Sequence, residues 1–510
     1  MPETWAKYDH QARQPSQPSQ PSDPAQPRRA SVDLHLDLPG SSKHVRRDLE
    51  TALRDAVRTG RLGPGTRLPS SRALAADLGL ARNTVAEVYT QLVAEGWLTA
   101  RTGSGTSVAE RPAAQPAPDP LARPQTAAPR YDLRPGVPDL SAFPGSAWLA
   151  TARKVLATAP RSLLDYPDRQ GLPELRTMLA GYLARARGVV ADPGHIVVCA
   201  GFAHGLTVAC AALRSAGAAT LAVESYGHQA HRDLAQGQGL NLRPLPVDGR
   251  GAVLGALEGA DAALLTPAHQ FPLGVTLHPQ RRRDAARWGG VVIEDDYDGE
   301  FRYDRQPVGA LQALAPDHVI YAGTASKSLI PALRLGWLVV PSRLLDAVTA
   351  QLTAGPSGLD QLILAEFIAS GGYDRQIRRT RLAYRRRRDR LTAALRGQGR
   401  HVTGIAAGLH AVLDLPGPQA ERQLINSAAE HGLALQGLSS FRAPGAATDR
   451  AGLVIGYARS PDHAYTTALA RLCAALDLTG LTGRAGPAPA GPAGPAAPAT
   501  RRPRNSSVRR

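Results

Sequence analysis

Apolar residues recur every three to four positions between residues 41 and 96, and this pattern predicts three consecutive helices. In the first helix, Val45, Leu49, Leu53 and Val57 lie on one face, and the pattern stops near Gly60. The segment is therefore expected to bury one apolar stripe per helix in a small common core.

The second and third predicted helices are separated by a short turn. Ser70 can cap the second helix and Gly79 can end it, while the third begins near Arg82 and stops at Gly96. The apolar face of the third helix carries Val85, Val88, Tyr89 and Leu92. Two helices joined by about three residues are typical of a helix-turn-helix, and the alternation in WLTARTGSGTSVA (97–109) predicts a β-hairpin wing behind it.

From residue 131 to about 480 the pattern changes to short runs that are apolar on both faces and alternate with helical segments. The runs are HIVVCAG, TLAVES, LRPLPVD, AALLTPA, GGVVIEDDY, HVIYAGT and LRLGWLVV. Strands buried on both sides and separated by helices predict an α/β sheet that is mostly parallel. The later runs GLHAVLDL, LALQGLSS and GLVIGYA predict further strands in a smaller C-terminal α+β lobe.

Three segments of low complexity separate and flank these regions. Residues 1–40 are rich in Pro, Gln and Ser, residues 110–130 in Pro and Ala, and residues 481–510 in Pro, Ala and Arg. We expect two disordered tails and an extended linker. The folded domains are then predicted at 41–109 and 131–480.

The charge balance favours a polyanionic partner. The 510 residues carry a formal net charge of +17. Part of it lies in the tail 481–510, with six arginines, and in the run 375–390, with nine arginines against one aspartate. A solvated face and direct phosphate contact both explain such runs.

The cysteines and the hydropathy bear on the compartment. Cys199, Cys210 and Cys473 each lie in an apolar stretch, which favours buried thiols over a disulfide framework or a metal site. No apolar run approaches the length of a membrane span, and no apolar core of a signal peptide follows the N-terminus. We expect a soluble cytoplasmic protein.

The predicted helix-turn-helix carries polar residues where DNA would be read, since the start of its second helix enters the major groove. Arginine can pair with guanine in a fork, and Asn and Thr can reach bases or phosphates. The candidate contacts are Arg82, Asn83 and Thr84 on the reading helix, Arg72 on the preceding helix, and Arg101, Thr102 and Gly103 in the wing. A three-helix surface unit with incidental arginines is the alternative.

A second kind of chemistry surrounds Lys327, in the segment GTASKSLIPALRLG. This lysine follows an apolar strand and has Thr324, Ser326 and Arg334 nearby, which are suited to a phosphate. A lysine that captures an aldehyde needs partial burial, and most lone lysines are solvated surface charges instead.

A pyridoxal phosphate site needs further groups, and the chain offers them. A carboxylate must hold the pyridine nitrogen protonated, and Asp295 and Asp296 compete for this role. Tyr297 can meet the ring hydroxyl, and the turn at Gly201 can present a helix N-terminus to the phosphate.

These motifs resemble two known families. LGPGTRLPSSRALA, ARNTV and GWLTARTGSGT resemble the winged helix-turn-helix of GntR-type transcription regulators, except that Ala81 stands where the family usually has a capping Ser or Thr. The later segments resemble fold-type I aminotransferases of the aspartate aminotransferase class: SAFPGSAWL, YPDRQGLPELRTMLAGYLARARGV, TPAHQFPLGV, IEDDYDGEF and GTASKSLIPALRLGWL. The combination looks like the MocR subfamily of GntR-type regulators, and within that subfamily the chain resembles the PdxR-like branch.

The resemblance implies roles for individual residues. Lys327 would form the Schiff base with pyridoxal phosphate, Asp295 rather than Asp296 would hold the pyridine nitrogen, and Tyr297 would meet the ring hydroxyl. The other implied cofactor contacts are Gly201, Phe202, Ala203, Thr324, Ser326 and Arg334 for the phosphate and His228, His269 and Gln270 for the ring. For Glu294 and Glu300 we prefer a structural role.

Two departures from the aminotransferase pattern bear on function. His228 of ESYGH falls where relatives place a tyrosine that stacks on the cofactor ring. Val454 of LVIGYA falls where transaminases have the arginine that clamps the substrate α-carboxylate, and Arg450 or Arg442 could substitute from a loop.

The sequence therefore predicts a homodimeric DNA-binding regulator whose aminotransferase-like domain serves as the sensor. Since the carboxylate clamp is missing, the preferred effector is pyridoxal phosphate itself, with genes of vitamin B6 metabolism as targets. The alternatives are a regulator that senses an amino acid or amine through an external aldimine, and an active aminotransferase with a vestigial DNA-binding head.

Overall fold

The computed structural model describes residues 45–101, 103, 105–110, 129–303, 308–448 and 450–480. The predicted tails over 1–40 and 481–510, nearly all of the linker 110–130, and the wing residue Thr102 lie outside the described residues. The chain divides into two compact units, residues 1–126 and 127–510.

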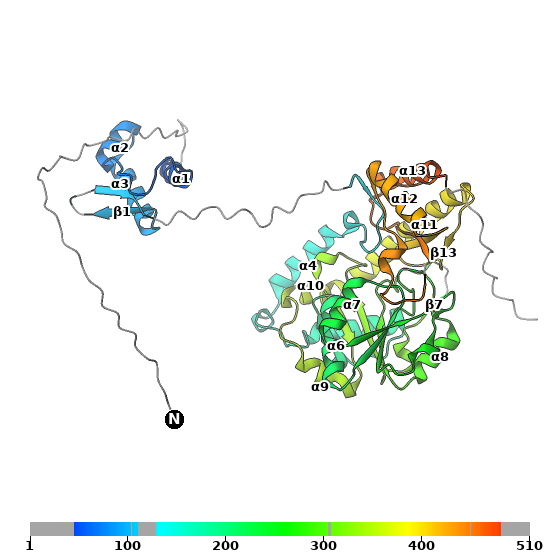
Figure 1. Ribbon diagram of the computed structural model, residues 1–510. Coiled ribbons are helices and arrows are strands. Elements are labelled where there is room, and N and C mark those ends of the chain that lie inside the picture. Colours follow the sequence, from blue (N-terminus) through cyan, green and yellow to red (C-terminus); the bar gives the residue numbers. More distant parts are fainter. Residues whose placement is uncertain are drawn as a thin grey trace, which may run out of the picture. The chain divides into compact units, whose positions relative to one another are not determined.

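The first unit contains the three predicted helices and the predicted hairpin (Figure 1). They are α1 (Val45–Arg58), α2 (Ser71–Leu78), α3 (Arg82–Ala94), β1 (Leu98–Arg101) and β2 (Gly105–Val108), with the two strands antiparallel. The apolar faces meet in one core that includes Leu49, Leu53, Val85, Val88 and Leu92. The winged helix-turn-helix prediction is thus confirmed.

The ends of α2 and α3 differ in how they are capped. The Ser70 hydroxyl accepts a hydrogen bond from the Ala73 amide at 3.2 Å, and Gly79 ends α2 in the left-handed conformation with φ 65°. Ala81 precedes α3 and has no side-chain acceptor to offer. The reading helix therefore begins without the cap that α2 has.

The second unit is built on a seven-stranded sheet in the order β4-β12-β11-β10-β9-β5-β6. The strands are β4 (Ile196–Cys199), β5 (Thr220–Glu224), β6 (Asn241–Leu245), β9 (Ala262–Leu265), β10 (Val291–Asp295), β11 (Val319–Thr324) and β12 (Gly336–Val339). Only β12 runs antiparallel to its neighbours in this sheet. All seven runs predicted as strands lie in this sheet, so the mostly parallel α/β prediction is confirmed.

Helices cover both faces of this sheet because its strands are apolar on both sides. Side chains of α6 (Phe202–Ser215) and α9 (Ser342–Ala350) pack on one face, and those of α5 (Pro173–Arg187) and α10 (Gly358–Ala369) pack on the other. Around them lie α4 (Gly145–Thr158), α7 (Gln229–Gly237), α8 (Pro279–Arg287) and the two-residue strands β7 (Val247–Asp248) and β8 (Gly251–Ala252).

The smaller lobe contains the antiparallel sheet β13-β14-β16. Its elements are β13 (Val402–Thr403), β14 (His410–Leu415), β16 (Ala451–Gly456), α11 (Gly372–Gly397), α12 (Pro418–Glu430) and α13 (Asp462–Leu478). The predicted strand LALQGLSS was wrong beyond its first residues. Within it, β15 (Leu433–Ala434) pairs with β3 (Tyr131–Asp132), and Gly437 forms an isolated bridge with Leu453. A 3-10 turn follows at Leu438–Phe441, where the Ser439 amide donates to Glu421 at 3.3 Å.

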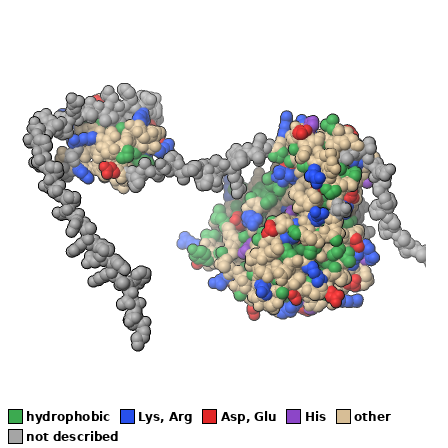
Figure 2. All heavy atoms as spheres, viewed as in Figure 1, with side chains coloured by type: hydrophobic (Ala, Val, Ile, Leu, Met, Phe, Trp, Pro, Cys, Tyr) green, Lys and Arg blue, Asp and Glu red, His purple; other side chains and the backbone are tan. Residues whose placement is uncertain are grey.

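The arginine run lies on α11, and part of it cross-links the fold. Arg387 is buried and pairs with Asp139 at 2.6 Å and Asp462 at 2.8 Å. Arg381 donates to the Glu300 carbonyl at 2.7 Å. Figure 2 shows Lys and Arg side chains scattered over the visible face of the second unit. The run is therefore more than a solvated face.

The three cysteines are free thiols. Cys199 and Cys210 are buried, and burial raises the pKa of each thiol to about 12, while Cys473 is partly exposed. The described helices include none with the length and apolar character needed to cross a membrane.

Candidate functional site

A cavity of about 290 Å³ lies at the carboxyl ends of the central strands, beside the smaller lobe. This is the edge where open α/β sheets bind ligands. Nine of the twelve predicted cofactor residues line it: Phe202, Ala203, His228, Asp295, Tyr297, Thr324, Ser326, Lys327 and Arg334. His231, Phe271 and His410 also line it and were not predicted: His231 lies on α7, Phe271 in a turn that follows β9, and His410 at the start of β14.

Lys327 lies in the turn after β11, with its amine inside the cavity. The amine donates to the Gly136 carbonyl. Burial lowers the pKa of Lys327, and the charges of Asp295 and Asp298 partly oppose this. A lysine with a lowered pKa spends more time neutral, which is the form that attacks an aldehyde.

The two competing carboxylates have different surroundings. Asp296 accepts from the Arg187 guanidinium at 2.6 Å and from the Tyr321 hydroxyl at 2.8 Å, all of them buried. Asp295 lines the cavity, and its buried Oδ1 has no hydrogen-bond partner in the described part of the chain. Burial raises the pKa of Asp295 well above its ordinary value, although the Lys327 charge works against this. Of the two carboxylates, Asp295 is therefore the one that lines the cavity and has an oxygen without a partner in the described part of the chain.

An anion cradle forms beside the start of α6. Gly201 caps this helix with φ 80° and has no side chain, so the first amides of α6 remain open to a ligand. The Arg334 guanidinium lies against Gly201, since a Cβ placed there would be 3.4 Å from Arg334 Cζ. Thr324 and Ser326 share hydrogen bonds of 3.0 and 3.1 Å at the adjoining strand end.

Arg334 has an unusual backbone. Its φ of 51° makes it the single non-glycine residue with positive φ in the described ranges. Non-glycine residues in this conformation cost about 1–3 kcal/mol and gather at ligand sites. The strained backbone of Arg334 therefore belongs to a residue whose guanidinium lines the cavity.

His269 and Gln270 stand behind the cavity wall and do not line it. His269 Nδ1 lies 2.8 Å from Asp298 Oδ2 and 3.0 Å from the Tyr297 hydroxyl. Gln270 donates to Glu224 at 3.1 Å and to the Tyr226 carbonyl at 2.9 Å. Both residues thus act on the cavity through neighbours, His269 by orienting Tyr297.

His228 at the start of α7 stacks on Phe271, with ring centroids 4.1 Å apart and 14° between the planes. Burial, with smaller contributions from Lys327 and Arg232, lowers the pKa of His228 to about 4. The imidazole is therefore neutral at physiological pH and presents a flat, uncharged ring to the cavity.

The place of the missing carboxylate clamp is apolar. Val454 on β16 is fully buried opposite Val412 and packs in a cluster with Phe271 and Phe441. Neither predicted substitute lines the cavity: Arg450 binds Asp414 at 2.7 Å, and Arg442 donates to the Thr448 carbonyl at 2.8 Å.

The remaining carboxylates near the cavity have structural contacts. Glu294 accepts from the Leu311 and Gln312 amides at 2.7 and 2.9 Å, and Glu300 accepts from the Tyr182 hydroxyl at 3.2 Å.

Among the described residues, His269, Asp298 and His410 place ligand atoms within 4.8 Å of one another, as a metal site would. His410 instead bonds to the Pro272 carbonyl at 2.9 Å.

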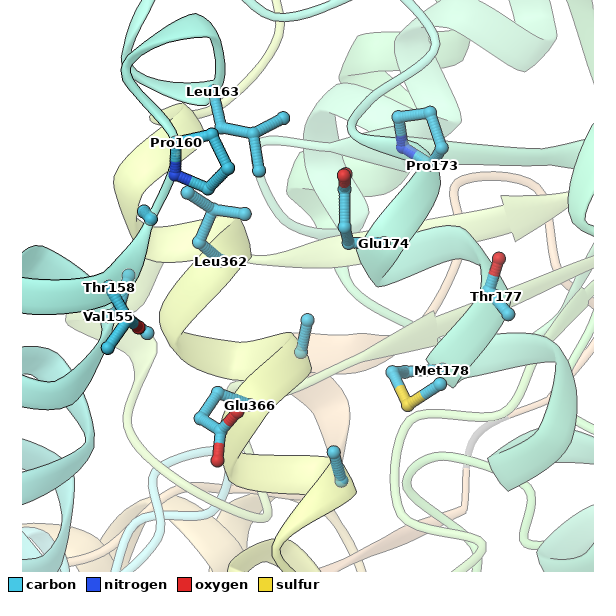
Figure 3. Close-up of a pocket in the computed structure, with 13 residues that line it drawn as sticks. Val155, Thr158, Pro160, Leu163, Pro173, Glu174, Thr177, Met178, Leu362 and Glu366 are labelled. Atoms are coloured by element: carbon cyan, nitrogen blue, oxygen red, sulfur yellow. The ribbon is translucent and has the colours of Figure 1, made fainter.

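A larger hollow of about 550 Å³ lies between α4, α5 and α10, away from Lys327 (Figure 3). Figure 3 shows apolar side chains such as Met178 and Leu362 around it. Its Glu366 accepts from Lys154 at 2.6 Å. We assign no chemistry to this hollow because its lining is mainly apolar and Glu366 is paired with Lys154.

On the first unit, the predicted DNA contacts lie on the surface. Arg72, Arg82, Asn83, Arg101 and Gly103 are exposed and Thr84 is partly exposed. The opposite face of α3 is buried in the core through Val85, Val88, Tyr89 and Leu92. The reading helix thus has the polar and apolar faces that a helix-turn-helix requires.

Comparison with known proteins agrees with both units. Residues 46–108 match the family described as Bacterial regulatory proteins, gntR family, and residues 136–471 match Aminotransferase class I and II. The chain is 34% identical over 473 residues to the HTH-type pyridoxine biosynthesis transcriptional regulator PdxR of Corynebacterium glutamicum, covering 88% of this chain and 99% of that protein.

Two further likenesses bear on the same point. The MocR protein of Rhizobium meliloti is 33% identical over 400 residues, covering 72% of this chain and 79% of that protein. The crystal structure of Pyrococcus horikoshii kynurenine aminotransferase in complex with PMP is similar in fold, with a TM-score of 0.62 at 22% identity over 69% of this chain and 92% of that one. The chain belongs to the MocR-like, GntR-type transcription regulators, which join a DNA-binding winged helix-turn-helix to a pyridoxal-phosphate-binding domain of aminotransferase class I and II.

Proposed function

We propose that this regulator senses pyridoxal phosphate itself and controls genes of vitamin B6 metabolism. The observation that carries the proposal is the contrast inside one cavity. Groups suited to the cofactor face it from several elements, whereas the place of the substrate clamp is filled by buried Val454.

The described residues fit the cofactor. Asp295 offers an unpartnered buried oxygen to the pyridine nitrogen, and Lys327 offers an amine of lowered pKa to the aldehyde. Arg334, Thr324 and the first amides of α6 suit the phosphate. When bound, the cofactor supplies an electrophilic aldehyde and an electron-withdrawing ring.

The apolar surroundings of Val454 disfavour an amino acid as the effector. A carboxylate that is desolvated without a paired cation binds poorly. Arg450 and Arg442 are tied to other groups, so neither supplies that cation from its present position. The relative PdxR is named for pyridoxine biosynthesis, which supports the cofactor as effector and vitamin B6 genes as targets.

For the assembly we propose a homodimer acting on DNA in the cytoplasm. Several large apolar side chains near the start of the second unit are exposed, as expected for a surface that a second copy covers: Leu140, Leu149, Leu156, Leu164 and Tyr166. Two heads are needed to read two half-sites. The cofactor can regulate only by binding one arrangement of the heads better than another.

The test is to load the purified protein with pyridoxal phosphate, reduce it with borohydride and map the pyridoxyl adduct on peptides. The chain has four lysines, Lys7, Lys43, Lys154 and Lys327, so the assignment is unambiguous. We expect the adduct on Lys327 alone, its loss in Lys327→Ala, and its retention in the matched Lys154→Ala variant.

A second measurement separates the candidate effectors. Promoter fragments retained by the protein are compared with and without pyridoxal phosphate, and loaded protein is titrated with amines while its absorbance is followed. Altered retention with no absorbance shift supports the proposal. An amine-dependent shift without keto-acid product favours amine sensing, and turnover indicates an aminotransferase.

A further inference from the structure

A second polar pocket lies in the smaller lobe, at the C-terminal end of α11, and the proposed function does not use it. It has a volume of about 170 Å³. Arg388, Thr392 and Arg396 line it from successive turns of α11, and Arg400 and His401 line it from the chain that follows. Residues four apart on a helix lie on one face, which is why the arginines of this helix converge here.

The guanidinium groups in this pocket are poorly compensated. In the described ranges, no carboxylate lies within 4.0 Å of the Arg388, Arg396 or Arg400 side chains. Arg388 makes one long contact, 3.5 Å to the Ile405 carbonyl, and its buried Nε has no partner there. Buried donors without partners are rare, so Arg388 keeps hydrogen-bonding capacity that its neighbours in the described ranges do not use.

The nearby acids do not neutralise the pocket. Asp389 on α11 lies 3.9 Å from Arg385, outside it. Asp477 on α13 acts on Arg400 through its charge, yet its carboxylate accepts the Gln398 amide at 3.0 Å. Arginines at a helix C-terminus also complement its dipole, but that amounts to roughly half a negative charge against three guanidinium groups.

The geometry points to a binding site for a small phosphate monoester, and we propose that this pocket is a second anion site, separate from the cradle at Arg334. Three fork-shaped guanidinium groups and a hydroxyl match the oxygens of a phosphoryl group. At about 30 Å³ per water, the pocket holds roughly five to six waters, which suits a phosphoryl group and little more. A recessed pocket also favours a compact anion over a continuous DNA backbone.

The test is isothermal titration of the full chain, already loaded with pyridoxal phosphate so that the cradle at Arg334 is filled. The probes are inorganic phosphate and glycerol 3-phosphate. We expect saturable binding that the double variant Arg388→Ala/Arg400→Ala weakens at least tenfold. The matched variant Arg378→Ala/Arg386→Ala removes two exposed arginines of the same helix and should change affinity less than twofold.

Three outcomes overturn the proposal: no saturable binding, equal loss in both double variants, or weakened binding of a promoter fragment with no change for either probe. The last would assign the pocket to the DNA backbone. If the Arg388 variant unfolds, Arg396→Gln/Arg400→Gln leaves Arg388 in place, removes charge from exposed Arg396 and partly exposed Arg400, and gives the same readout.

Discussion

Both units of this regulator depart from their family patterns, and the departures at Ala81 in the first unit and Val454 in the second act at different levels. Ala81 retains the extended backbone of a helix cap, φ −68° and ψ 135°, and lacks only the acceptor. Val454 stands where the resemblance to transaminases implies a charged ligand contact, and its neighbours Val412 and Phe441 are apolar as well. The first change costs some stability of an unaltered surface, whereas the second changes what the cavity can bind.

If the departure at Val454 affects only substrate binding, the residues expected to hold the cofactor should keep their roles. Variants of the adjacent carboxylates Asp295 and Asp296 test this. Asp296→Asn should lower the free energy of unfolding by about 3–5 kcal/mol, because it leaves the Arg187 guanidinium buried without its counter-charge. Urea unfolding of the full chain measures the loss. Asp295→Asn is the matched variant and should spare stability but release pyridoxal phosphate on dialysis. The reverse pattern would exchange the roles assigned to the two residues.

The strongest way to break the comparison is to restore the missing charge. Val454→Arg should destabilise the second unit by about 3 kcal/mol, because an unpaired charge enters an apolar cluster. Thermal unfolding of the loaded protein measures this, with Val454→Met as an uncharged control of similar length. A variant as stable as the parent would mean that the site around residue 454 still has space and hydration for a charged side chain.

The reading surface of the first unit should respond to loss of one side chain by a smaller amount. Arg82→Ala is expected to weaken operator binding by about 1–3 kcal/mol per half-site, because a base contact is lost from the reading helix. Arg58→Ala removes an exposed arginine of α1 and serves as the control. Gel retardation at fixed salt gives the ratio, and unchanged affinity would remove Arg82 from the interface.

The elements and the cofactor motifs could be predicted from sequence because their signals are local. The seven strands of the large sheet are apolar on both faces and bounded by Gly, Pro or Asp, so each can be recognised from its own residues. Lys327, Thr324 and Arg334 lie within eleven residues of one another. Their convergence on one cavity follows from the turn between β11 and β12.

The residue roles that could not be predicted from sequence depend on partners far away along the chain. Asp295 and Asp296 are neighbours at the end of a strand, and the contact that separates them comes from Arg187, 109 residues earlier. In the sequence, Arg387 is one arginine of a basic run. Its buried ion pair depends on Asp139, which lies 248 residues away. Phe271 and His410 were not among the predicted site residues, because a cavity wall and a core have the same local pattern.

The smallest expected effect tests the other side of the comparison, that the departure at Ala81 is only energetic. Ala81→Ser supplies an acceptor at a position whose backbone already suits a cap, as Ser70 does for α2. A capping hydroxyl adds about 1 kcal/mol, so the amides of the first turn of α3, including Thr84, should exchange with solvent about fivefold more slowly in the full chain. Ala81→Val lacks the hydroxyl and should give no protection. Operator affinity should stay unchanged, because the cap acts on backbone amides and leaves Arg82 and Asn83 exposed as before. If Ala81→Ser instead altered the preferred operator sequence, residue 81 would belong to the reading surface, and the departure in the first unit would concern specificity, like the one at Val454.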